Sequence, residues 1–260
     1  MSNLMTIIII SERTNFPSLY LWTISFRKTS NHKTFINMKR ILLFVILCIG
    51  LNSFAQTTWT GAGANSNWNN IANWNTNLVP TASDDVIIPD GSSVIVNVSS
   101  FVKSIVVQGT STITINQNFS FTNASSFSAN TIVNWNNNSL YGGGTLTNNG
   151  TVNLTTSGSR YVSGGTTIIN NGLFTMPAAG YFYLYDTSIF NNTSNGTFDI
   201  QSDAILSYSG TSHNFTNAGL LKKSTTSGSA QIQCILTNTG NISVESGTLS
   251  LTALPKTFNS

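Results

Sequence analysis

The sequence contains very little charge, since Asp, Glu, Lys and Arg make up 7% of its 260 residues. Its formal net charge of +3 arises in residues 1–55, whereas residues 56–260 hold five Lys or Arg against seven Asp or Glu. A slightly acidic region lacks the basic surface that nucleic acid binding requires. It also lacks the cationic face of a peripheral membrane binder. We therefore expect neither nucleic acid nor a membrane surface as a partner of residues 56–260.

Cysteine and histidine are equally scarce, with two of each in the chain. Cys48 lies in an apolar run that we expect to be removed, so the mature chain has no internal disulfide. Cys234 alternates with polar residues in "QIQCIL" and is expected to be a small buried hydrophobic residue. His213 in "GTSHNFTN" is the only histidine after residue 55, so any catalytic triad or dyad would depend on it alone. We interpret it as a solvated loop residue.

Carboxylates are too sparse to form an evident catalytic group. The nearest approach is a set of acidic residues and one arginine between residues 160 and 203, namely Asp186, Asp199, Asp203 and Arg160. Hydrolysis by paired carboxylates stays open as an alternative, as does a polysaccharide lyase. The prediction is a protein that is not an enzyme and that needs no cofactor.

The N-terminal region contains the features of a secretory signal peptide. From Met38 the sequence reads "MKRILLFVILCIGLNSFAQ", with two basic residues, an apolar run of 11 residues and small residues at Ser53 and Ala55. This pattern predicts a signal peptide at 38–55, because the apolar run is shorter than the ~20 residues that span a bilayer. We expect residues 1–37 to be a wrongly included upstream extension. The mature protein would then be secreted or held at the outer cell surface, with no integral membrane span.

Beyond residue 55 the chain is rich in Asn, Ser and Thr, which form more than two-fifths of that region. Apolar residues recur in it with period two, as in Val94, Val96 and Val98, and again at Ile113 and Ile115. Strict alternation of β-branched residues is typical of half-buried strands. A disordered polar segment has no reason to maintain it.

A phrase centred on a glycine recurs at nearly constant spacing. It reads "TLTNNGTVNL" at 145, "TIINNGLFTM" at 167, "IFNNTSNGTFDI" at 189, "NFTNAGLLKKS" at 214 and "ILTNTGNISV" at 235. Its glycines are spaced by 22, 24, 23 and 21 residues, at Gly150, Gly172, Gly196, Gly219 and Gly240. A degenerate copy, "SFTNASSFSA" at 120, has Ser125 where the glycine is expected. A period near 22 residues predicts a solenoid.

The alternation makes each repeat two or three short strands, with corners at glycines that tolerate left-handed turns. The predicted fold is all-β, a right-handed parallel β-helix (β-solenoid) of about seven or eight coils. One asparagine lies two residues before each glycine, and stacked coils would place these side chains ~4.8 Å apart. Side-chain amides at that spacing form hydrogen-bonded ladders. The predicted ladder contains Asn148, Asn170, Asn217 and Asn238, with Asn191 or Asn192 in the third copy.

Residues 57–91 read "TTWTGAGANSNWNNIANWNTNLVPTASDDVIIPDG" and precede the repeats. Together with the repeats, this stretch resembles the N-terminal part of exported bacterial surface proteins with a right-handed parallel β-helix. Such proteins are common in the Bacteroidetes and are similar in style to adhesin and autotransporter passenger domains. The resemblance covers roughly residues 57–251 and rests on the elements W-x-G, N-W, V-P and D-D-V-x-I-P. It implies a secreted or cell-surface role and carries over no catalytic residue.

Residues 56–90 are expected to form an N-terminal cap and 91–260 the repeats. The first coil of a solenoid exposes its core, and the cap would cover it with Trp59, Trp68 and Trp74. The alternative for these rings is a platform for carbohydrate. Asp84, Asp85 and Asp90 are interpreted as solvated turn residues, with a calcium site as the alternative.

The stretch "YFYLYD" at 181–186 would point Phe182 and Leu184 inward and Tyr181, Tyr183 and Tyr185 outward. These tyrosines are a candidate contact for glycans or another cell surface, and packing between coils is the alternative. The repeat continues to the end of the sequence, so we expect a truncated chain whose open C-terminal coil favours self-association. The predicted function is a structural or adhesive scaffold.

Overall fold

The computed structural model describes residues 56–210, 213–252 and 256–258. The predicted extension at 1–37 and signal peptide at 38–55 lie outside the described residues. The described part falls within one compact unit, Gln56–Ser260. It contains a single short 3-10 helix, η1 (Ile71–Asn73), and no helix in these ranges is long and apolar enough to cross a membrane.

The unit consists of three parallel sheets, and each sheet runs along the stack of coils. The first sheet contains β1 (Thr57–Thr58), β2 (Asp85–Ile88), β5 (Ser104–Val107), β8 (Ser125–Phe127), β11 (Thr145–Asn148), β14 (Thr167–Asn170), β17 (Ile189–Asn192), β20 (Asn214–Asn217), β23 (Leu236–Asn238) and β26 (Lys256–Phe258). The second contains β3 (Ser93–Val96), β6 (Thr112–Ile115), β9 (Ile132–Trp135), β12 (Thr151–Asn153), β15 (Leu173–Met176), β18 (Thr197–Ile200), β21 (Leu220–Lys223) and β24 (Asn241–Val244). The third contains β4 (Ser100–Val102), β7 (Phe119–Phe121), β10 (Asn138–Tyr141), β13 (Ser159–Val162), β16 (Tyr181–Tyr185), β19 (Ile205–Ser209), β22 (Ser229–Ile232) and β25 (Thr248–Leu251).

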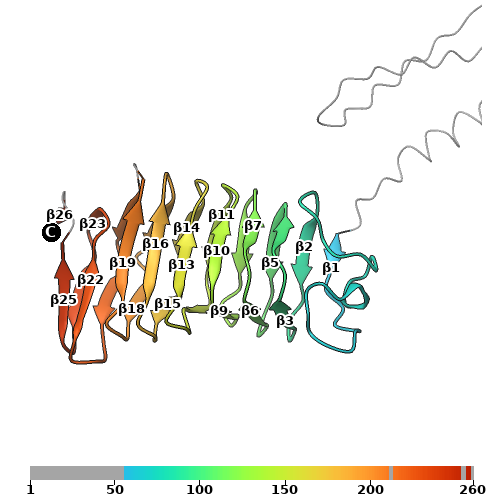
Figure 1. Cartoon of the computed structure of the whole chain (residues 1–260), viewed down its shortest axis with the longest axis horizontal. Helices are drawn as coiled ribbons and strands as arrows, with labels where there is room; N and C mark the ends of the chain where they lie inside the picture. Colours follow the sequence, from blue (N-terminus) through green and yellow to red (C-terminus); the bar gives the residue numbers. More distant parts are fainter. Residues whose placement is uncertain (1–55, 211–212, 253–255, 259–260) are drawn as a thin grey trace, which may run out of the picture. The chain divides into compact units, whose positions relative to one another are not determined.

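The chain passes from the first sheet to the second and then to the third, and each passage completes one coil. β2, β3 and β4 form the first coil, and β23, β24 and β25 form the eighth. Figure 1 shows the coils side by side in sequence order along the unit. The predicted right-handed parallel β-solenoid is confirmed, with three strands in each coil. Eight coils at ~4.8 Å each correspond to a stack of roughly 38 Å.

The alternation in the sequence fills the inside of the solenoid from all three sheets. Alternate residues of most strands are buried, as in β6, where Ile113 and Ile115 are each 2% exposed. The middle coils contain a continuous stack of buried phenylalanines. It consists of Phe174, Phe182, Phe190, Phe198 and Phe215, whose neighbouring rings lie 5.0 to 6.2 Å apart. Such dense aromatic packing is a major source of stability in the described residues, where Cys234 is a free cysteine.

The predicted asparagine ladder is present and runs through five coils. The Nδ2 of each asparagine donates to the Oδ1 of the next, at 2.8 Å from Asn148 to Asn170 and 2.7 Å from Asn192 to Asn217. The third place belongs to Asn192, whereas Asn191 is half-buried and accepts a bond from the Thr216 hydroxyl. Each Nδ2 also bonds the carbonyl of the following repeat glycine. The amides are thereby satisfied inside the solenoid, where unpaired ones would be costly.

The repeat glycines have a different role from the one predicted. None of Gly150, Gly172, Gly196, Gly219 and Gly240 has a positive φ, so a left-handed turn is not what requires glycine there. The requirement is close approach between coils. A Cβ on Gly219 would lie 2.2 Å from the carbonyl oxygens of both Gly196 and Thr193, and one on Gly240 would lie 2.2 Å from that of Gly219. These glycines form a column in which only a hydrogen atom fits between stacked backbones.

Gly219→Ala is therefore expected to lower the free energy of unfolding by about 1–3 kcal/mol, because both obstructing atoms belong to the backbone. Chemical denaturation followed by circular dichroism measures this loss. Gly158→Ala is the matched control, because the φ of Gly158 is not positive and its Cβ would meet only two side-chain oxygens, at 3.5 and 3.7 Å. A Gly219 variant no less stable than the Gly158 variant would show that close approach is not the constraint.

The predicted alignment of the earlier copy at residue 120 is wrong. In the sheet register Asn148 pairs with Phe127, and Ser125 pairs with Leu146 rather than occupying the place of Gly150. Asn123 therefore lies outside the ladder. Early coils are also shorter, since Val86 pairs with Ile105, 19 residues on, whereas Asn170 pairs with Asn192, 22 residues on. A repeat defined on the later coils does not transfer to the earlier ones.

Candidate functional site

The predicted tyrosines lie on the outer face of the third sheet, close to a fourth. In β16 Phe182 and Leu184 are buried, while Tyr181 is 40% exposed and Tyr183 and Tyr185 are half-buried. Tyr161 of β13 is the direct cross-strand neighbour of Tyr183. We call Tyr161, Tyr181, Tyr183 and Tyr185 the tyrosine cluster.

The rings of the tyrosine cluster pack mainly against one another. The Tyr183 ring is nearly parallel to two neighbouring rings, with centroids 5.2 Å from Tyr161 and 5.3 Å from Tyr181. Tyr185 meets Tyr161 edge-on at 5.6 Å. These stacked contacts cover part of the Tyr183 ring, which is half-buried. Burial, reinforced by the neighbouring phenols, raises the pKa of Tyr183. Its hydroxyl therefore stays protonated at neutral pH, as a donor and an acceptor.

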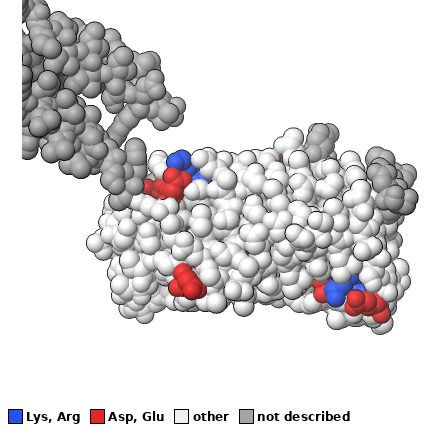
Figure 2. Space-filling model, turned by 180° about the vertical axis from the view of Figure 1, so that it is seen from behind, with Lys and Arg blue, Asp and Glu red and all other residues white. Residues whose placement is uncertain are grey.

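The outward strand positions around the tyrosine cluster are uncharged, and the nearest exposed carboxylate in the chain, Asp186, follows Tyr185 at the edge of the sheet. The outward strand positions of the third sheet from β7 to β25 carry hydroxyl, amide, aromatic or aliphatic side chains. They are Ser120, Ser139, Tyr141, Ser159, Tyr161, Tyr181, Tyr183, Tyr185, Ile205, Ser207, Ser209, Ser229, Gln231, Thr248 and Ser250. Figure 2 shows the molecule from behind the view of Figure 1, and on that face the charged atoms form small groups toward the two ends. A neutral, hydroxyl-rich surface suits neutral ligands better than ionic ones.

The three tryptophans of the N-terminal region lie inside the core. Trp59, Trp68 and Trp74 are at most 4% exposed, and Trp74 packs edge-to-face on both of the others. Trp68 continues this contact to Phe119 of the third sheet at 5.3 Å. The indole of Trp74 donates to the Trp68 carbonyl at 2.8 Å. Because the ring faces are covered, these tryptophans offer no flat platform to a carbohydrate.

The acidic residues near the tryptophans are engaged in local bonds. Asp84 accepts from the amide and hydroxyl of Thr81, and Asp90 accepts from the amide and hydroxyl of Thr110. Asp85 pairs with Lys103 at 2.7 Å, and this hydrogen bond lowers the pKa of the carboxyl. Within the described ranges, no group of three His, Cys, Asp or Glu residues is placed to hold a metal ion.

The arginine and carboxylates considered for an enzyme are not brought together as a catalytic group. Arg160 points into the solenoid, fully buried, and its guanidinium donates to the carbonyls of Trp135, Gly158 and Thr156. Burial lowers the pKa of Arg160 to about 10, so it remains charged at neutral pH. Asp199 pairs with Lys222 at 3.7 Å and accepts from Gln201. Asp186 lies at a corner with φ 53°.

Sequence reasoning missed the two buried cations. Lys223 is fully buried, and its Nζ donates to the Thr226 hydroxyl at 2.6 Å and lies 3.4 Å from Asp203. Arg160 shares its inward parity with Val162, and Lys223 shares its own with Leu221. The alternation of the two strands therefore places both cations on the inward side, and this is the sequence feature that predicts their burial. Both cations bond backbone carbonyls at corners, which is a structural use of charge.

The remaining candidate nucleophile and base are both buried. Cys234 is 1% exposed, as predicted, and burial raises the pKa of its thiol to about 12, which makes it unreactive. His213 was expected to be solvated, but it is 5% exposed and stacks on Tyr208 with centroids 3.9 Å apart. Neither of its ring nitrogens has a hydrogen-bond partner among the described residues. Burial lowers the pKa of His213.

The depressed pKa of His213 predicts a loss of stability on acidification. Below about pH 6.5 His213 binds a proton in the unfolded chain but not in the folded chain. The free energy of unfolding therefore falls as the pH is lowered, until the pH reaches the folded pKa. The expected fall is on the order of 1 kcal/mol or less. Denaturation at pH 7.5 and 5.5 measures it. His213→Gln should lack this component, and an identical slope in both proteins would contradict the assignment.

The chain was compared with protein-family models, curated proteins and solved structures, and no significant match was found in any of the three.

Proposed function

We propose that this protein is an exported structural scaffold that contacts neutral glycans through the tyrosine cluster. The observation that carries the proposal is the outer face of the third sheet, whose outward strand positions are uncharged and which has the tyrosine cluster at its centre. A neutral polysaccharide offers many hydroxyls and no charge, so it matches this face in hydrogen bonding without desolvating an ion. Anionic polysaccharides would find no cationic side chain at the outward strand positions between β7 and β25.

A non-enzymatic role is part of the same proposal. It is supported by the environments of the candidate catalytic groups. Arg160 and Cys234 are buried, and Asp199 and Asp203 each form an ion pair with a lysine. The runner-up is a β-helix enzyme acting on polysaccharide. Incubation with neutral and anionic polysaccharides, followed by an assay for new reducing or unsaturated ends, decides between the two. Product formation would establish the enzyme and overturn the scaffold.

Replacing Tyr181, Tyr183 and Tyr185 together with phenylalanine tests the contact. Phenylalanine keeps the stacked rings and removes the hydroxyls, so the melting temperature should change by no more than a few degrees. Binding to an immobilised neutral glycan, such as a β-glucan or a mannan, should fall at least fivefold. This fall corresponds to about one lost hydrogen bond.

Two further variants separate contact from packing. Alanine at the same three positions should reduce both binding and melting temperature, because it also removes the stacked rings. The double variant Thr248→Ala with Ser250→Ala, on the outer face of β25, is the matched control and should bind like the original protein. Lost stability with unchanged binding in the tyrosine variants would overturn the glycan contact.

Export is the second part of the proposal and is supported by the sequence of residues 38–55 alone. Expression of the chain from Met38, the predicted start, in a bacterium with a secretory pathway should yield a processed protein that begins at Gln56. N-terminal sequencing and intact mass measure the cleavage site. A product that stays in the cytoplasm at full length would overturn export.

A further inference from the structure

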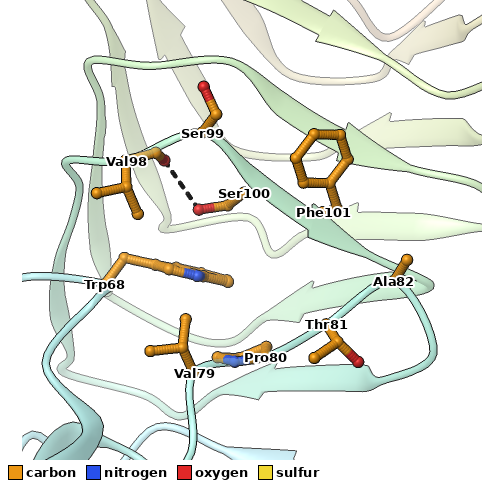
Figure 3. Close-up of a pocket in the computed structure, with 9 residues that line it drawn as sticks. All are labelled: Trp68, Val79, Pro80, Thr81, Ala82, Val98, Ser99, Ser100 and Phe101. Carbon is orange, nitrogen blue, oxygen red and sulfur yellow. Dashed lines mark hydrogen bonds between the residues drawn. The ribbon is translucent and has the colours of Figure 1, made fainter.

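A pocket of about 360 Å³ lies near the N-terminal end of the solenoid, separate from the tyrosine cluster. One side is the loop between η1 and β2, with Val79 and Pro80, and the other is the corner that leads into β4, with Val98 and Ser100. Figure 3 shows the Trp68 indole lying between these two sides. Pockets that hold small ligands begin at about this volume.

The chemistry of the lining is uniform and uncharged. Its walls are mainly apolar, and the ring of Phe101, 47% exposed, stands at its edge and contacts Tyr141 edge-on at 6.0 Å. The hydroxyl of Ser100 donates its hydrogen bond to the Val98 carbonyl at 2.9 Å, so it does not donate to a ligand (Figure 3). The hydroxyl of Thr81 likewise donates to Asp84. A charged ligand would lose its hydration here without gaining a partner.

One polar group in this lining is unexplained by the fold. Trp68 is fully buried, and its indole N–H has no hydrogen-bond acceptor among the described residues. The indoles of Trp74 and Trp135 differ in this respect, since they donate to the carbonyls of Trp68 and Asn137 at 2.8 and 3.0 Å. A buried donor without an acceptor costs about 1–3 kcal/mol, so native structures rarely keep one without a reason.

We infer that this pocket binds a small uncharged molecule with an apolar, ring-sized body and a single carbonyl oxygen. The body fills the space between Pro80, Val79 and Phe101, and the carbonyl accepts the hydrogen bond of the Trp68 indole. A sugar ring fits less well, because its several hydroxyls would need partners that this lining lacks. The site is independent of the proposed glycan contact and would stand if that contact failed.

Acetophenone and ethylbenzene are the matched probes, because they differ mainly in the carbonyl oxygen. The full chain, labelled with ¹⁵N at the tryptophan indoles, reports binding through its indole N–H resonances, and Trp68→Phe identifies the resonance of Trp68. Acetophenone should move that resonance downfield and saturate. Ethylbenzene should bind at least about tenfold more weakly, as expected for loss of one hydrogen bond to a buried donor. The resonances of Trp74 and Trp135 serve as internal controls and should move less.

Phe101→Ala gives a test that does not depend on replacing a core residue. It should weaken acetophenone binding at least fivefold, while Leu78→Ala, at a position 67% exposed and outside the lining, should leave binding unchanged. The inference is overturned if acetophenone produces no saturable shift, if ethylbenzene binds equally well, or if Phe101→Ala has no effect. Saturable binding of glucose in place of acetophenone would overturn the ligand class.

Discussion

Replacing Asn192 with aspartate is expected to lower the free energy of unfolding by about 3–5 kcal/mol at pH 7. The two side chains have the same shape, so the change creates no cavity. The amide nitrogen of Asn192 points at three oxygens, those of Gly196, Asn217 and Leu220, at 3.2, 2.7 and 3.1 Å. A carboxylate oxygen in its place would face all three without a proton to share. Guanidinium denaturation monitored by circular dichroism measures the loss.

The same variant has a defined pH dependence. Burial among oxygens raises the folded pKa of the new carboxyl above its unfolded value of about 3.9, so the penalty is present above the folded pKa and declines as pH falls through it. The loss relative to the original protein should therefore be smaller at pH 4 than at pH 7. Asn195→Asp, an exposed position in the same corner, is the control. Equal losses at positions 192 and 195 would show that the ladder contributes nothing specific.

Truncating Phe198 to alanine is expected to cost about 3–5 kcal/mol. Its ring is fully buried, stacks on Phe174 at 5.3 Å, and meets Phe190 and Phe215 edge-on at 5.2 and 5.3 Å. Because these rings come from the first and second sheets, the cavity would loosen two walls of the solenoid at once. Phe198→Leu keeps most of the volume and should cost less than about 1.5 kcal/mol.

The comparison that isolates burial is Phe101→Ala. Phe101 is 47% exposed on the outer face of β4, so its loss should cost less than about 1 kcal/mol. Differential scanning calorimetry of the three variants gives the ranking Phe198→Ala, Phe198→Leu, Phe101→Ala. A reversed order would mean that the phenylalanine stack does not hold the middle coils together.

The features that could be predicted from the sequence are those that repeat. Alternation with period two fixes which residues of β6 and β16 face inward, and the 22-residue period brings Asn148 and Asn170 to the same place in successive coils. These patterns are local, and each copy of the repeat contains the same residues for the same reason, namely that its strands must bury one face and stack on the next coil. The fold class and four ladder positions followed directly, and Asn192 was one of two alternatives for the fifth.

Features that depend on one coil meeting the next could not be predicted in the same way. The glycine column reflects the distance between two backbones, which no single repeat contains, so its glycines were wrongly assigned to left-handed turns. The register of β8 differs from that suggested by the phrase at residue 120, because early coils are shorter. The burial of Arg160 and Lys223 was not predicted, because a charged side chain is expected on the outside of a strand even where the alternation places it inside.

The candidate sites likewise combine features that the sequence pattern predicts with features that depend on contacts between coils. The outward direction of the tyrosines follows from parity, but their stacking depends on Tyr161, which lies in another coil. The pocket beside Trp68 depends on a loop of irregular conformation and could not be inferred from any repeat.

The asparagine ladder also gives the solenoid an electrical direction. In every pair the amide nitrogen belongs to the earlier coil and the oxygen to the later one. The five side-chain dipoles therefore align, with the partial negative charge toward Asn148 and the partial positive charge toward Asn238. Aligned amides polarise one another, so the row is stronger than separate bonds would be. Two such solenoids placed side by side would prefer antiparallel orientation, and dielectric relaxation of Asn192→Leu should reveal a smaller dipole moment along the stack.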